Sequence, residues 1–182
     1  ISGIQDINMS YSVSEKPVNI LGVGFARSIY NAPLQGTVSL SRDILYQDPI
    51  LQYTGEKEVS GTIVYDNDSK VVGFNSGYLT NYSVSCRVGD SPTVGCEFVS
   101  FEFGSGIRNG ALDYSGNSNP INYLTAANQG SIFVDVSGSG TNRVTAISQT
   151  INVGREPVYN IRAGHSNIPA QVITKYPIQV QT

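Results

Sequence analysis

Two stretches decide the fold class of this sequence: Tyr78-Leu-Thr-Asn-Tyr82-Ser-Val84-Ser-Cys86 and Cys96-Glu-Phe98-Val-Ser-Phe101-Glu-Phe103. Apolar and polar residues alternate in both, which is the spacing at which a β-strand places one set of side chains on a core and the other in water. The same alternation recurs at residues 11–14, 36–41, 59–65, 132–136 and 170–180. The pattern predicts an all-β protein, built as an antiparallel β-sandwich or a partly closed barrel, with long loops and at most one short helix.

The 182 residues suffice for one β domain spanning 1–182. Residues 104–130 are rich in Gly, Ser and Asn and poor in strand patterns, so we expect an extended loop there, with the one helical candidate at 120–129. In an assembling protein such a loop would be an arm toward a neighbouring subunit. A plain surface loop is the alternative.

A faint internal repeat is visible when the sequence is compared with itself. The matching positions are Ile4 with Val144, Ile7 with Ile147, Tyr11 with Ile151, Val13 with Val153, Pro17 with Pro157 and Val18 with Val158, all 140 residues apart. Each copy later reaches a Pro-aliphatic-Gln start of a strand, at Pro33 and at Pro177. The repeat predicts two related units, at about 4–41 and 144–182, lying side by side in the sheets.

The composition disfavours several functions. Charged residues make up 14% of the chain, the formal net charge is −3, and the seven Arg and four Lys are scattered singly, unlike the basic clusters of a nucleic-acid reader. One histidine, His165, leaves little for a metal site or for nucleophile activation. No apolar run approaches the roughly 20 residues of a membrane span. We therefore expect no enzyme activity, no catalytic residues, no cofactor, no metal and no membrane partner.

Smaller motifs have ordinary interpretations. Asp66-Asn-Asp-Ser69 superficially resembles the start of a calcium loop, but it lacks the glycine and glutamate that complete one, and it is better read as a turn. Arg42-Asp43 and Asp48-Pro49 bring opposite charges close in sequence, as an exposed ion pair would.

Cys86 and Cys96 are the only two cysteines and lie equidistant from Ser91. A hairpin centred on Ser91 would make them cross-strand neighbours, able to form a disulfide in an oxidising compartment and left as thiols in a reducing one. The sequence leaves both states open, and two small buried side chains would explain the pair as well.

Aromatic residues are the candidates for a contact surface, because a tyrosine ring can be buried while its hydroxyl stays hydrogen-bonded. A sugar-binding face is the alternative, weakened by the absence of tryptophan. The candidate residues of a subunit interface are Tyr78, Tyr82, Val84, Phe98, Phe101, Phe103, Tyr114 and Tyr123.

The order of motifs resembles that of structural proteins of tailed bacteriophages, in particular tail-tube-like β-sandwich subunits. The resemblance covers most of the chain and rests on Glu15-Lys-Pro-Val18, Arg155-Glu-Pro-Val-Tyr159, Asp48-Pro-Ile-Leu51 and the stretches 33–41 and 73–85. It implies a virion subunit, assembled in the host cytoplasm, that forms homo-oligomeric rings, most simply hexamers. Stacked rings would contact other tail proteins and enclose a lumen through which DNA passes without specific binding.

Strand edges with little charge need partners, and pairing within a ring would satisfy them. We expect the strands around residues 78–103 to pair with those of adjacent subunits. Two other classes remain open: another virion component such as a neck or fibre protein, and a secreted or cell-surface β-sandwich module that mediates adhesion or binds carbohydrate.

Overall fold

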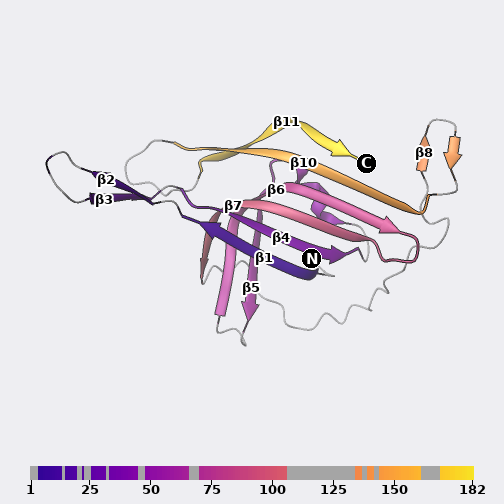
Figure 1. The fold of residues 1–182 in the computed structure, drawn as a ribbon, viewed down its shortest axis with the longest axis horizontal. Coiled ribbons are helices and arrows are strands. Elements are labelled where there is room, and N and C mark those ends of the chain that lie inside the picture. The colour runs from indigo at the N-terminus through magenta and orange to yellow at the C-terminus, as the bar shows by residue number, and fades with distance from the viewer. Residues whose placement is uncertain are drawn as a thin grey trace.

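The computed structural model describes residues 4–13, 15–19, 22, 26–31, 33–44, 48–65, 70–105, 134–136, 139–141, 144–160 and 169–182. Eleven strands and one 3₁₀ helix lie in these ranges (Figure 1). They are β1 (Ile4–Ser12), β2 (Glu15–Asn19), β3 (Ala26–Asn31), β4 (Gln35–Asp43), η1 (Pro49–Thr54), β5 (Val59–Tyr65), β6 (Lys70–Arg87), β7 (Thr93–Ser105), β8 (Val134–Val136), β9 (Ser139–Thr141), β10 (Ala146–Val158) and β11 (Gln171–Gln181). The expected loop at 104–130 and helix at 120–129 fall almost wholly outside the described residues.

Seven strands form one sheet in the order β1-β4-β7-β6-β10-β11, with β5 pairing to β6 off this path. Every pairing is antiparallel. The all-β expectation is therefore confirmed. Among the described strands the large sheet is open, with β1 and β11 as its two ends, and not closed into a barrel. The hairpins β2–β3 and β8–β9 form two-stranded sheets of their own and project from opposite ends of the molecule (Figure 1).

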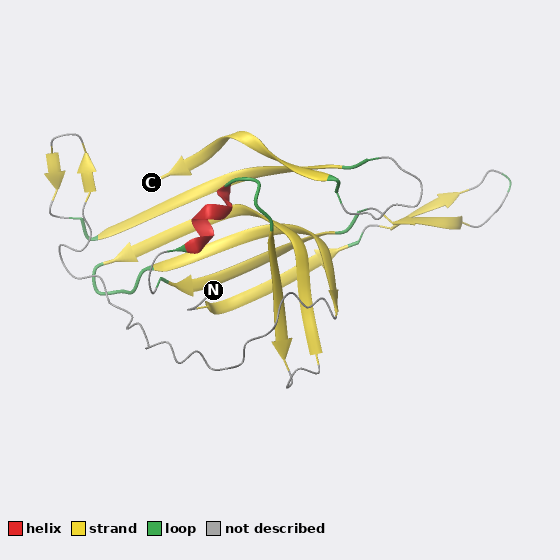
Figure 2. Cartoon of the chain, turned by 180° about the vertical axis from the view of Figure 1, so that it is seen from behind, coloured by secondary structure: helices red, strands yellow, loops and turns green. Residues whose placement is uncertain are grey.

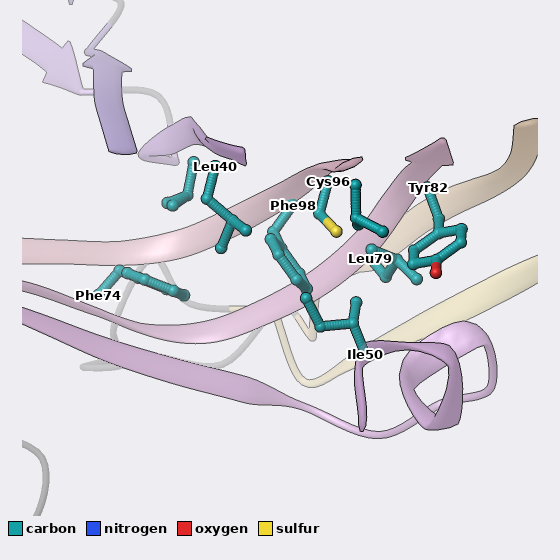
Figure 3. Close-up of a cluster of buried hydrophobic side chains, with 9 residues drawn as sticks. Leu40, Ile50, Phe74, Leu79, Tyr82, Cys96 and Phe98 are labelled. Carbon is teal, nitrogen blue, oxygen red and sulfur yellow. The ribbon is translucent and has the colours of Figure 1, made fainter. Parts of the chain in front are cut away.

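The main core lies on one face of this sheet, where the alternation places the apolar set. Val38 and Leu40 of β4 lie opposite Phe98 and Cys96 of β7. These side chains are at most 9% exposed, and they form one cluster with Leu79, Tyr82 and Val94 (Figure 3).

The 3₁₀ helix η1 covers this core face. Its N-cap residue Asp48 accepts a hydrogen bond from the amide of Ile50 at 2.9 Å, and Pro49 follows in the first turn, which is the arrangement that starts a helix. Ile50 is fully buried and points into the cluster toward Phe98 (Figure 3).

Strands β6 and β7 bend together, so that β5 and the neighbouring ends of β6 and β7 turn away from the rest of the sheet (Figure 2). Ser76 has a φ of 49°, and the buried Ser100 Oγ donates to the carbonyl of Asn75 at 2.6 Å. A hydroxyl that bonds to the backbone competes with the ladder and favours such a kink. A second buried cluster contains Tyr78, Val99, Phe101 and Val172.

The two repeat units contribute a pair of antiparallel strands each, β1–β4 and β10–β11. They are not side by side: β7 and β6 lie between them, so the units form opposite ends of one sheet. The second Pro-aliphatic-Gln motif also differs from the prediction. Pro177 lies inside β11, at an irregularity in its pairing with β10, while Pro33 precedes β4.

Candidate functional site

The face of the sheet opposite the main core carries two continuous rows of polar residues, which we call the polar face. One row crosses all six strands as Asp6, Ser41, Gly95, Ser83, Thr150 and Gln181. The neighbouring row crosses them as Asn8, Ser39, Glu97, Asn81, Asn152 and Gln179. Between these rows, pointing to the other side, runs an apolar row of Ile7, Leu40, Cys96, Tyr82, Ile151 and Val180.

Short side chains without positive charge characterise the polar face. Its two rows contain two carboxylates, Asp6 and Glu97, and no Lys or Arg. Asn81 Nδ2 donates to Asn152 Oδ1 at 2.6 Å, so part of the surface is held by its own hydrogen bonds. Arg87 lies on the same side of β6 but beyond these rows, at the turn end of the strand, opposite Ala146. The solvated face of an antiparallel sheet is usually polar, so polarity alone is not distinctive. The absence of Lys and Arg from both rows is the more specific feature.

A shallow groove of about 270 Å³ follows the polar face between Asp6, Ser39, Ser83 and Glu97. Hydroxyl and carboxylate oxygens line it, so it presents acceptors and negative charge. The two carboxylates of this wall repel a polyanion, and no Lys or Arg lines the groove.

The predicted interface residues lie elsewhere. Tyr78, Tyr82, Phe98 and Phe101 are between 1% and 6% exposed. Val84 and Phe103 pack against the core as partly buried residues. Burial inside the chain leaves Tyr78, Tyr82, Phe98 and Phe101 almost no surface for a neighbour, so the interface prediction is wrong for these four; for Val84 and Phe103 it stays a prediction. Tyr114 and Tyr123 lie outside the described residues, as do His165 and 66–69.

The expectation that strands around residues 78–103 pair with adjacent subunits is also wrong. β6 and β7 are central strands: β7 lies between β4 and β6, and β6 also pairs with β10 and β5. Their backbone groups therefore have partners within the chain. The two ends of the six-strand path, β1 and β11, each pair on one side only, and so does β5, which pairs with β6 off this path (Figure 1). Alternation along the sequence shows which residues form strands, but strand order depends on contacts between distant segments.

A buried ion pair fastens η1 to the sheet. Arg42 Nη2 of β4 lies 2.9 Å from Asp48 Oδ1, and the two side chains are 4% and 5% exposed. Tyr82 of β6 donates its hydroxyl to Asp48 Oδ2 at 2.9 Å. The expected exposed pair is therefore a buried one between Arg42 and Asp48. The Asp48-Pro49 dipeptide favours the start of a helix, and this is the signal in the sequence that could have indicated η1.

A second polar cluster centres on Arg155 of β10. Its guanidinium donates to the carbonyls of Leu79 and Tyr53, at 2.8 and 3.1 Å, and to the hydroxyl of Thr174 in β11. It also lies 5.8 Å from the centre of the Tyr78 ring, and the Tyr78 hydroxyl donates to Glu58 at 2.8 Å. Burial lowers the pKa of Arg155, without removing its charge near neutral pH. The guanidinium thus joins β6, β10, β11 and the end of η1, which is a structural role.

Alkaline pH should destabilise the protein through Tyr78 and Tyr82. Burial, followed by the hydrogen bonds to Glu58 and Asp48, raises the pKa of both phenols. The native state therefore keeps these protons above the ordinary tyrosine pKa of about 10, where the unfolded chain loses them. We expect the free energy of unfolding to fall as pH rises beyond about 10, as measured by urea denaturation. Tyrosinate absorbance that rises through pH 10 for all tyrosines without unfolding would contradict this.

The two cysteines are not cross-strand neighbours. The β6–β7 register places Cys96 opposite Tyr82, and Ser85 opposite Thr93. The hairpin turn is thus centred near Gly89, whose φ is 94°, and not on Ser91. Cys86 lies four residues beyond Tyr82 along β6, roughly 13 Å away, which is too far for a disulfide with Cys96. Both thiols are free.

The two thiols should differ in reactivity. Cys96 is buried, and burial, with the nearby Asp48 carboxylate, raises its pKa to about 12, while Cys86 is partly exposed. Since the thiolate is the reactive form, we expect a disulfide reagent at pH 8 to modify one thiol per native chain and two after unfolding. Two equally fast reactions in the native state would contradict the buried position of Cys96.

The described residues contain no group of three or more His, Cys, Asp and Glu side chains arranged to hold a metal ion. Within the same ranges, no helix is both long and apolar enough to cross a membrane.

No protein-family model matches this chain, and no curated protein sequence is significantly similar to it.

Proposed function

We propose that this chain is a self-assembling structural subunit of a bacteriophage virion, a tail tube protein whose rings stack around a lumen that conducts DNA. The observation that carries the proposal is the polar face, because two rows of short polar and acidic side chains cross six strands without one Lys or Arg. The polar face would line the lumen.

The physical requirement on such a lining is that DNA moves past without being held. Proteins that bind DNA neutralise phosphates with Lys and Arg, and each such contact adds affinity. Asp6 and Glu97 instead repel phosphates, at a range of about 10 Å at 0.1 M salt. Most side chains in the two rows are Ser, Thr or Asn, which project only a short way into a passage.

The open ends of the sheet support self-assembly. β1 and β11 are 9 and 11 residues long, and each pairs on one side only among the described strands. Apolar side chains along them are exposed, Tyr11 at 63% and Val180 at 55%. Long strand edges of this kind are sites of pairing with another chain.

The partners in this proposal are copies of the chain in a closed ring, with a hexamer as the simplest expectation, and other virion tail proteins. The location is the virion, after assembly in the host cytoplasm. A neck or fibre component would share the same open edges but would not require rows without cations around a lumen.

Electron microscopy of the purified chain over a concentration series tests the proposal. We expect rings or stacked rings with a central opening, together with concentration-dependent mass in sedimentation velocity. A threefold rod without an opening would favour a fibre component. A monodisperse monomer at all concentrations would contradict self-assembly.

DNA retention tests the role of the polar face within these assemblies. Wild-type assemblies should retain no duplex DNA in a gel-shift assay at low salt, because the two rows carry carboxylates and no cation to neutralise phosphates. The double variant Ser39→Lys and Ser83→Lys should retain it, since both positions lie in the groove. If the wild type retained DNA through this face, the proposal that DNA passes the lumen without being bound would be contradicted.

A further inference from the structure

Strand β11 consists of two parts with different surroundings. Its pairing with β10 shifts between Lys175 and Gln179, where Tyr176 and Pro177 lie. Before this irregularity, Val172 and Thr174 are buried, and Val172 belongs to the cluster of Tyr78 and Phe101. After it, the last residues of the strand pair regularly with β10 and extend both rows of the polar face.

The irregular middle of β11 is unsuited to pairing with another strand. It combines Lys175, Pro177 and a bulge, and these are the features by which sheet edges avoid association. The end of the strand, Ile178, Gln179, Val180 and Gln181, carries neither a charge nor a proline. The end of β11 therefore lacks the features that discourage pairing in its middle.

The apolar row is incomplete at this end. Leu40, Cys96 and Tyr82 in its middle are between 2% and 9% exposed, but Val180, its last member, is 55% exposed. At the other end of the row, Ile7 of β1 is partly buried against the core. A strand that continued the row beyond Val180 would cover an exposed apolar side chain.

Strand directions determine which strand fits there. Five antiparallel pairings separate β1 from β11, so the two end strands run in opposite directions. If a second copy continues the sheet in the same orientation, its β1 is antiparallel to the β11 that it meets. Isologous pairing of two β11 ends would instead stop at a dimer.

We propose that residues 178–181 of one copy pair antiparallel with residues 6–9 of the next copy, with Val180 opposite Ile7. This deepens, and rests on, the proposed function, because it names the joining surface of the assembly. In this register Gln179 lies opposite Asn8 and Gln181 opposite Asp6, so both rows of the polar face continue across the junction. A shift by one residue would turn the apolar set onto the polar face.

Substitution at Val180 tests the junction against a matched control. Val180→Lys should raise the concentration needed for assembly about tenfold or more, because it replaces a buried apolar contact with a charge. Tyr176→Lys is the control: Tyr176 is 74% exposed, more than Val180, but lies in the irregular part of β11. Urea unfolding should be nearly unchanged in both. Equal loss of assembly in both variants, or loss only in Tyr176→Lys, would overturn the junction.

Disulfide trapping tests the register. In a Cys86→Ser background, oxidation of assembled Asn8→Cys/Gln179→Cys protein should give a ladder of covalent oligomers longer than a dimer on a denaturing gel. Either single variant should give dimers at most. The out-of-register pair Ser10→Cys/Gln179→Cys should give little ladder.

The outcomes separate the two proposals. If the chain assembles but the Asn8/Gln179 pair gives no ladder, or the Ser10/Gln179 pair gives an equal or stronger one, the junction is wrong and self-assembly stands. If wild type and all variants remain monomers, self-assembly fails and the junction fails with it.

Discussion

Asp48→Ala should lower the free energy of unfolding by about 3–5 kcal/mol, because the Arg42 guanidinium would remain buried without its counter-charge. Asp48 lies 2.9 Å from Arg42 Nη2, accepts from the Tyr82 hydroxyl, and caps η1 through the Ile50 amide. The substitution removes three interactions at the point where η1 meets the sheet. Urea denaturation followed by circular dichroism measures the change.

An exposed ion pair provides the control for this prediction. Lys175 Nζ lies 3.0 Å from Glu156 Oε2, with both side chains more than half exposed. Solvent screens such pairs, so Glu156→Ala should change the free energy of unfolding by less than about 1 kcal/mol. Equal effects of the two alanine variants would show that η1 is not fastened by Asp48.

Phe98→Ala should cost about 3–5 kcal/mol, through lost burial and the cavity left behind. Phe98 is 1% exposed, lies opposite Val38 and Leu79 in the neighbouring strands, and faces Ile50 of η1 (Figure 3). The substitution therefore removes contacts between β7 and three other elements, β4, β6 and η1. Thermal and urea denaturation should both show the lower free energy of unfolding, and the unfolded fraction at 37 °C should increase.

Ile173→Ala is the matched control for Phe98→Ala. Ile173 is also an apolar strand residue, but it is 42% exposed. Surface substitutions of this kind usually change stability by about 0.5 kcal/mol or less. A mild effect of Phe98→Ala, within the range of the control, would place the core elsewhere.

Much of the candidate site was readable from alternation along single strands. In 36–41, the polar members Thr37, Ser39 and Ser41 alternate with Val38 and Leu40, and this predicted one polar and one buried face. Phe98 alternates with Glu97 in the same way, but Phe98, Val99, Ser100 and Phe101 are buried in succession, which alternation does not predict, and both phenylalanines were expected at an interface. Apolarity alone does not distinguish a core from a contact surface.

The Arg42–Asp48 pair shows another limit. Both residues were noted as charges close in sequence, consistent with an exposed pair. Arg42 and Asp48 are buried because η1 folds over β4 and β6, and no local sequence pattern predicts that contact. The prediction that Cys86 and Cys96 are cross-strand neighbours was wrong for a related reason. It placed the hairpin centre at Ser91, but the centre lies near Gly89, and this shift of two residues moves each cross-strand partner by four.

The sequence by itself determined that the chain is all-β, where several strands lie, among them 36–41, 59–65, 78–86 and 96–103, and that its cations are few and scattered. These properties follow from residue type and period-two spacing, which act within a strand. Only the tertiary structure decided strand order, and with it that β6 and β7 are central while β1 and β11 are the ends of the sheet. Strand order depends on pairing between residues far apart in the chain. For the same reason, the polar face exists only once six separate strands align their alternate residues into rows.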